Sequence, residues 1–182
     1  MEYKTPGVYI EEVSTFPPSV VAVPTAIPAF IGYTQSASAP NGDALTGIPT
    51  RITSILEYRL LFGARFQADN YLVTLNGTGA ATEVAAVQAR DTNNNARRYY
   101  LYDAVELFYQ NGGGPCYIVS VGNYENEIDD QDLENGINAV ETVDEPTLLL
   151  FPDAVELLDG NNPDLTNMGR LQALALAQCE AR

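Results

Sequence analysis

The pattern of hydrophobic and polar positions predicts the first elements of this chain. The run at 29–34, AFIGYT, is apolar almost throughout, which is typical of a buried strand. Residues 53–62, TSILEYRLLF, predict a helix, with Ser54 and Glu57 at the spacing of a capping box. Gly63 supplies the stop signal directly after it. We therefore expect a buried strand and then a capped helix in the first third of the chain.

The second half of the chain alternates between helical and strand-like patterns. The predicted elements are a helix over 99–110, a strand over 116–122, a helix capped by Asp129 or Asp130, a buried strand over 146–154, and a last helix that starts at Asn162–Pro163 and continues to Arg182. This order predicts an α/β fold, with a mixed, partly parallel sheet flanked by helices. Because no strand or loop follows the last helix to finish the sheet, we expect the chain to be truncated.

The first 28 residues differ from the rest because they hold five of the 11 prolines. Prolines prevent a helix and confine strands to short segments at sheet edges. The strand-forming residues between these prolines are Val8, Tyr9, Ile10, Val20, Val21 and Val23. A short strand with unpaired backbone groups invites pairing with the sheet edge of another chain. We therefore predict that residues 1–28 form an extended β arm that links neighbouring subunits.

The remaining residues, 29–182, are predicted to form one domain that is interrupted by an insertion at 67–98. In this insertion the sequence becomes polar and rich in Gly and Asn, between two well-patterned helices. Two strand-like runs within it, YLVTL and EVAAVQA, flank Gly77 and Gly79. This arrangement predicts a polar, hairpin-like insertion that protrudes from the domain.

Composition excludes several classes of function. The net charge is −15, from 24 acidic and 9 basic residues, which argues against binding nucleic acid or an anionic membrane. The chain has no histidine, so the commonest general base and the commonest metal ligand are both missing. Of the two cysteines, Cys116 lies in an apolar strand-like run and Cys179 in a helix-like run, and both are expected to be buried free thiols rather than a disulfide.

Three motif-like clusters lack the context that their chemistry needs. The run GTGAAT at 77–82 lacks the third glycine of a dinucleotide fingerprint. The glycines at 112–114 follow a predicted helix and precede a strand, whereas a phosphate loop has the opposite order. The acidic residues at 130–141 have a spacing close to that of a calcium loop, but the required glycine is displaced to Gly136. We therefore predict no catalytic residue, no cofactor and no metal site.

Three separated stretches resemble phage-type contractile tail sheath proteins. They are YKTPGVYIEEV followed by PTAIPAFIGYT at the N-terminus, PTRITSILEYRLLFG at 49–63, and NGGGPCYIVSVG at 111–122 followed by an acidic helix and PTLLLFPDA. Their order and approximate spacing also match, and together they cover most of the chain outside 67–98. Within this family, the chain is most similar to the sheaths of extracellular contractile injection systems and related phage-tail-like particles.

This resemblance implies a structural subunit and not an enzyme. Sheath subunits form stacked hexameric rings around an inner tube and attach to a baseplate, and the sheath shortens to drive the tube into a target membrane. The implied partners are other sheath subunits, the inner tube protein and baseplate proteins, without nucleic acid and without direct membrane insertion. The implied location is the bacterial cytoplasm during assembly, and then a released particle or a virion tail. Sheath chains are longer, so the resemblance also implies that the C-terminal assembly part of the family is absent from these residues.

Two other classes remain compatible with the sequence. One is an acidic adaptor or baseplate protein with a sheath-like fold. The other is a small-molecule-binding α/β domain that uses the carboxyl ends of its strands, near Gly122 or Asp153.

Overall fold

A central four-stranded sheet organises the computed structural model, which describes residues 26–68, 70–77, 79, 82–90, 98–159 and 162–181. Its strand order is β2-β5-β1-β6. The central strand β1 runs parallel to both of its neighbours, β5 and β6, while β2 pairs antiparallel with the outer side of β5. The fold is therefore α/β with a mixed, mostly parallel sheet, as predicted.

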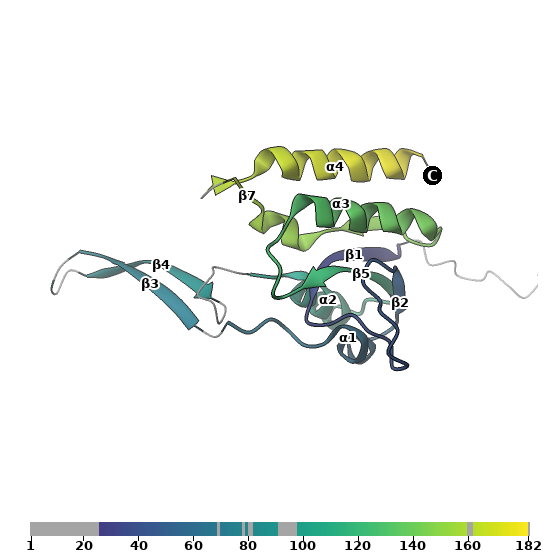
Figure 1. The fold of residues 1–182 in the computed structure, drawn as a ribbon, viewed down its shortest axis with the longest axis horizontal. Coiled ribbons are helices and arrows are strands. Elements are labelled where there is room, and N and C mark those ends of the chain that lie inside the picture. Colours follow the sequence, from purple (N-terminus) through teal and green to yellow (C-terminus); the bar gives the residue numbers. More distant parts are fainter. Residues whose placement is uncertain are drawn as a thin grey trace, which may run out of the picture.

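The predicted elements occur in the predicted order, and three short strands that were not predicted, β2, β7 and β8, are added (Figure 1). The strands are β1 (Pro28–Thr34), β2 (Thr50–Ile52), β3 (Asn70–Asn76), β4 (Glu83–Arg90), β5 (Cys116–Asn123), β6 (Leu148–Leu150), β7 (Leu158–Asp159) and β8 (Asn162–Pro163). The helices are α1 (Ile55–Phe62), α2 (Leu101–Gln110), α3 (Asp130–Ala139) and α4 (Leu165–Glu180), with short 3-10 segments at Val140–Thr142 and Pro152–Glu156.

Helices cover both faces of the sheet, so the core consists of two layers of side chains. Figure 1 shows α3 and α4 on one side of the sheet and α1 and α2 on the other. On the first side, Ile31 and Val119 of the sheet pack with Leu133 of α3. On the second side, Phe30 and Ile118 belong to a separate cluster with residues of α1 and α2. Because alternate residues of β1 and β5 contribute to opposite clusters, both strands are apolar at most buried positions, with Ser120 as a buried polar exception.

Local signals explain where the first helix begins and ends. Ser54 has extended backbone angles, and its Oγ accepts a hydrogen bond from the N–H of Glu57 at 3.2 Å. The carboxylate of Glu57 accepts from the N–H of Thr53 at 2.8 Å, one residue earlier than the residue that a capping box would use. Gly63 ends the helix with φ of 84°, a conformation that favours glycine.

Two sequence-based boundaries in the C-terminal third were wrong. The strand predicted as buried over 146–154 is the three-residue edge strand β6, and Leu148 is 51% exposed. An edge strand has a neighbour on one side only, so a continuous apolar run does not ensure burial. The last helix does not start at Asn162–Pro163, because these residues pair with β7. It starts at Leu165, and Asp164 caps it by accepting from the N–H of Asn167 at 2.9 Å.

The cysteine prediction holds in part. Both thiols are free, and Cys116 is buried, as expected. Cys179 is exposed, because α4 packs on α3 with one face only and Cys179 lies outside that face.

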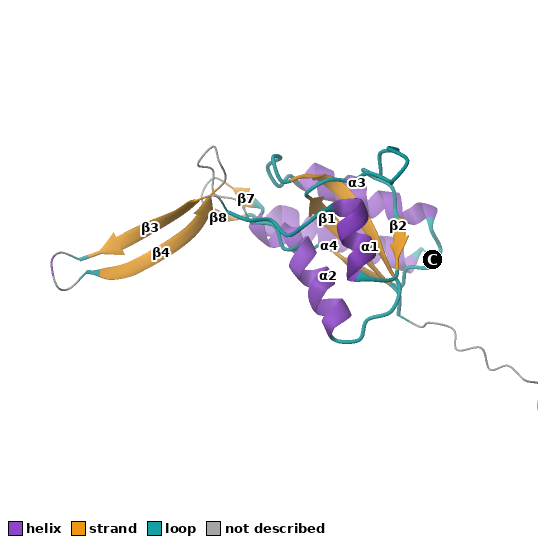
Figure 2. Ribbon diagram, turned by 90° about the horizontal axis from the view of Figure 1, so that it is seen from below, coloured by secondary structure: helices purple, strands orange, loops and turns teal. Residues whose placement is uncertain are grey.

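The insertion at 67–98 contains the predicted hairpin. Strands β3 and β4 pair antiparallel from Asn70–Arg90 to Asn76–Glu83, with a register shift between Thr74 and Leu75. Figures 1 and 2 show this two-stranded ribbon extending away from the sheet and its helices. The proposed arm residues Val8, Tyr9, Ile10, Val20, Val21 and Val23 lie outside the described residues.

Candidate functional site

The carboxyl ends of the parallel strands are the place where an α/β fold of this kind would hold a small ligand. Asp153 lies there, directly after β6, and is fully buried. Its Oδ2 accepts a hydrogen bond from the backbone N–H of Tyr33 at 2.8 Å. Its Oδ1 accepts from the N–H groups of Tyr100 at 2.5 Å and Leu101 at 3.1 Å. The carboxylate thus connects the end of β1 to the start of α2 at the carboxyl ends of the parallel strands.

The start of α2 depends on this carboxylate. Tyr100 occupies the N-cap position, but its side chain makes no capping hydrogen bond. A helix N-terminus has unpaired N–H groups and favours negative charge, and Asp153 supplies both acceptor and charge. Burial raises the pKa of Asp153 from 3.8 to about 6, although hydrogen bonds from the N–H groups of Tyr33, Tyr100 and Leu101 oppose that rise.

The second proposed ligand position, near Gly122, is also filled by protein groups. A Cβ on Gly122 would lie 2.7 Å from the ring of Tyr33. The hydroxyl of Tyr33 donates to Asp132 at 3.0 Å and accepts from the N–H of Asp129 at 2.9 Å. Burial is the main cause that raises the pKa of Tyr33 above its ordinary value. Both strand ends are therefore occupied by side chains that hold α2 and α3 on the sheet, and this geometry favours a structural role.

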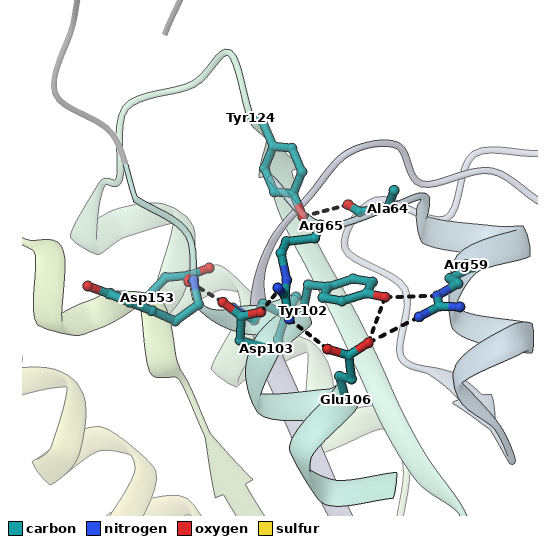
Figure 3. Close-up of polar contacts among 10 residues, drawn as sticks. Arg59, Ala64, Arg65, Tyr102, Asp103, Glu106, Tyr124 and Asp153 are labelled. Carbon is teal, nitrogen blue, oxygen red and sulfur yellow. Dashed lines mark hydrogen bonds and ion pairs between the residues drawn. The ribbon is translucent and has the colours of Figure 1, made fainter. Parts of the chain in front are cut away.

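A cluster of charged and aromatic side chains joins α1 to α2 (Figure 3). Arg59 donates to the hydroxyl of Tyr102 at 2.8 Å and forms an ion pair with Glu106 at 3.1 Å. Arg65 pairs with the other oxygen of Glu106 at 2.6 Å, and with Asp103 at 2.6 Å. Both guanidinium groups also lie within 6 Å of the ring of Tyr102, at 5.7 and 5.4 Å. The cluster fixes the position of α1 against α2.

Other arginines in the described part of the chain also have partners. Arg51 pairs with Glu145, and Arg170 pairs with Asp130 and Glu134. Arg98 donates to the hydroxyl of Tyr100 at 3.5 Å, which is a weak hydrogen bond. Because these cations are engaged within an acidic chain, they do not form a free basic patch for a polyanion.

The β3–β4 ribbon carries an exposed apolar face. The pairing of Val73 with Val87 places both on one face, which Tyr71 and Leu75 share as alternate residues of β3. Val84 joins this face because, after the register shift, it pairs with Leu75. This ribbon face consists of Tyr71, Val73, Leu75, Val84 and Val87, and the exposed fraction of each is between 46% and 66%. An isolated two-stranded ribbon is only marginally stable in water. Exposed apolar faces of this kind are common at contacts between proteins.

Sequence reasoning identified the hairpin but missed its ribbon face. The composition of the segment indicated a polar insertion, because the two strands contain Asn, Thr and Gln and the flanking loops contain Gly and Asn. The signal was the spacing of Tyr71, Val73 and Leu75 at every second position, which is obscured in the sequence by Leu72. Only the register of β3 and β4 combines these residues with Val84 and Val87 into one face.

The motif-like clusters have ordinary structural roles. The glycines at 112–114 form the turn between α2 and β5, where Gly112 has φ of 83°. Asp129 caps α3 through a hydrogen bond from the N–H of Gln131 at 2.8 Å, and Asp130 and Asp132 lie in the first turn. Among the described residues, no three His, Cys, Asp or Glu side chains are placed to hold a metal ion.

No helix in the described ranges has the length and apolar character that a membrane span requires.

Comparison with known proteins adds no identification. The chain matches no protein-family model and no curated protein sequence.

Proposed function

We propose that this chain is a structural subunit of a contractile sheath, which surrounds an inner tube and shortens to drive it through a target membrane. The observation that carries the proposal is the uncovered ribbon face on β3 and β4. A small folded domain with such an exposed apolar face is suited to bind another polypeptide, which would bury that face. In the described structure, the carboxylate of Asp153 is already paired with three backbone N–H groups, which disfavours it as a group that binds a small ligand.

The three sheath-like stretches support the same proposal because they belong to one structural unit. The first contains β1, the second contains β2 and α1, and the third contains the turn before β5 and most of that strand. In the sheet, β5 pairs with both β1 and β2. The resemblance therefore covers one contiguous packing unit instead of three unrelated surface segments.

The acidic surface is compatible with ordered assembly. A net charge of −15 keeps free subunits apart in solution through mutual repulsion. Contacts between subunits must then be made by segments with little charge. The strands of the ribbon contain one acidic and one basic residue, Glu83 and Arg90, so their net charge is zero.

Immunogold electron microscopy tests the proposal directly. Particles are isolated by ultracentrifugation from cells that express the gene and are labelled with antibodies against this domain. A sheath subunit predicts gold along the whole length of tubular particles, in both long and shortened forms. Label at one end only would instead support an adaptor or baseplate protein, and unlabelled particles would contradict the proposal.

A ligand screen distinguishes a sheath subunit from a small-molecule-binding domain. Thermal unfolding of the chain is followed with a panel of nucleotides and other small phosphorylated compounds at saturating concentration. A ligand that binds the folded state raises the unfolding temperature. The sheath proposal predicts no shift, whereas a shift that Asp153→Asn abolishes would support a ligand site at the strand ends.

A further inference from the structure

A groove of about 270 Å³ lies between β6 and the C-terminal end of α4. Its walls are formed by Asp144, Pro146, Thr147, Leu149, Gln178 and Cys179. In the described part of the sheet β6 pairs with β1 only, so its other backbone edge is open beside the groove. The groove is therefore bounded by the edge strand β6 on one side and by the C-terminal end of α4 on the other.

The side chain of Gln178 indicates what the groove binds. Only 7% of Gln178 is exposed, yet neither its Oε1 nor its Nε2 has a hydrogen-bond partner. Buried polar groups are normally paired, and an unpaired one destabilises the fold. A carboxamide carries one acceptor and two donors, so it can pair with the C=O and the N–H of a peptide backbone. The groove is therefore suited to an extended polypeptide segment, which could also pair with the open edge of β6.

We propose that, in the free subunit, this groove binds residues 13–25 of the same chain. These residues lead directly to Ile27, whose N–H donates to Thr147 Oγ1 at 3.0 Å. The carbonyl of Ile27 accepts from the N–H of Thr147 at 2.9 Å. Thr147 lines the groove, so the chain leaves the domain beside the proposed site. Figure 1 shows the end of α4 on the side of the molecule where β1 begins.

Charge and sequence also fit this occupant. Residues 13–25, VSTFPPSVVAVPT, contain no charged side chain, although the chain as a whole carries −15. Asp144 in the groove wall disfavours an acidic segment but not an uncharged one. The run VVAV at 20–23 is strand-forming, and five extended residues span about 17 Å.

Binding within one chain is favoured over binding between chains. A short tether gives the segment an effective concentration in the millimolar range, whereas free subunits repel one another through their charge. The inference concerns the free subunit and does not depend on the sheath proposal. In an assembling protein, it would mean that the arm must leave its own groove before it reaches a neighbour.

The thiol of Cys179 reports on occupancy, because it lines the groove while Cys116 is buried. The rate of maleimide labelling at Cys179, read by peptide mass spectrometry, is compared between the full chain and a variant that lacks residues 1–25. Both are measured at 1 and 100 μM, with circular dichroism as the check on folding. We expect labelling to be about tenfold faster in the shortened chain and independent of concentration in the full chain. Val21→Asp in the full chain is the second variant, in case the deletion unfolds the domain.

Gln178→Met tests the role of the carboxamide at nearly constant volume. In the full chain it should raise the labelling rate towards that of the shortened chain, whereas in the shortened chain it should change the rate little. Gln110→Met, at an exposed position on α2, is the matched control and should leave both rates unchanged. Equal rates in the full and shortened chains would overturn the proposal. Protection that appears only at 100 μM would also overturn it, because the occupant would then be another molecule.

Discussion

The carboxylate of Asp153 accepts a hydrogen bond from the N–H of Tyr100 at 2.5 Å, although 53 residues separate the two in sequence. Asp153 thereby caps α2 in place of a local side chain. The same carboxylate accepts from Tyr33 at the end of β1, so one buried group ties together three segments of the chain.

Replacement of Asp153 by Asn should destabilise the domain at neutral pH. An amide has one acceptor oxygen, and its NH₂ group would face an N–H donor, so at least one of the three hydrogen bonds is lost. We expect a loss of about 2 kcal/mol in the free energy of unfolding, measured by urea denaturation at pH 7. A loss below about 0.5 kcal/mol would show that the cap contributes little.

The pH dependence of that difference tests the raised pKa of Asp153. A carboxyl whose pKa is near 6 in the folded state and 3.8 in the unfolded state binds protons more tightly when folded. Stability therefore falls as pH rises between these values, by at most about 3 kcal/mol. Relative to Asp153→Asn, the wild-type chain should gain stability as pH is lowered from 7 to 4. The opposite slope would mean that the three N–H donors keep the carboxylate ionised.

Gly32 should tolerate no side chain, because it lies against Asp153. A Cβ at this position would overlap Asp153 Oδ2 and approach the Cβ of Leu101 to 3.2 Å. Gly32→Ala should therefore cost about 2 kcal/mol or more, since it displaces the buried carboxylate. Gly169→Ala is the matched control, because Gly169 is in the interior of α4 and a Cβ there would meet no atom within 4 Å. That variant should be more stable by about 0.5–1 kcal/mol, by the same denaturation assay.

The contact between α1 and α2 should depend on salt. Glu106→Gln removes the charge that pairs with both Arg59 and Arg65. We expect the thermal midpoint to fall by about 2–4 °C at low ionic strength. The difference should shrink in 1 M salt, where the screening length is about 3 Å. Glu145→Gln, which affects the more exposed pair with Arg51, should give a smaller change; an equal change would contradict a special role for the cluster.

The ribbon face should contribute to association and little to the stability of the domain. Leu75 lies on this face, while Leu72 lies on the opposite face of the same strand. Leu75→Ser should leave the unfolding midpoint of the domain nearly unchanged and reduce incorporation into particles, as measured by co-sedimentation. Leu72→Ser is the matched control and should be incorporated normally. If both variants are incorporated equally well, the ribbon face is not an assembly surface.

The sequence by itself determined those features that depend on neighbours within a few residues. The caps at Ser54 and Asp129, the stop at Gly63, and the apolar runs of β1 and β5 all follow from local backbone chemistry or from continuous burial. The order of these elements also predicted the α/β layering and a partly parallel sheet, because strands that are connected through helices often lie parallel in one sheet. The order did not predict β2, which pairs antiparallel with β5.

Only the tertiary structure decided which strand lies at the edge and which distant groups meet. The run 146–154 is as apolar as a central strand, but its position beside β1 alone leaves Leu148 exposed. The cap of α2 by Asp153 and the unpaired carboxamide of Gln178 likewise have no local sequence signal. Side chains far apart in the sequence are brought together by packing, and their partners are fixed by the three-dimensional arrangement of whole elements instead of by the spacing of residues along the chain.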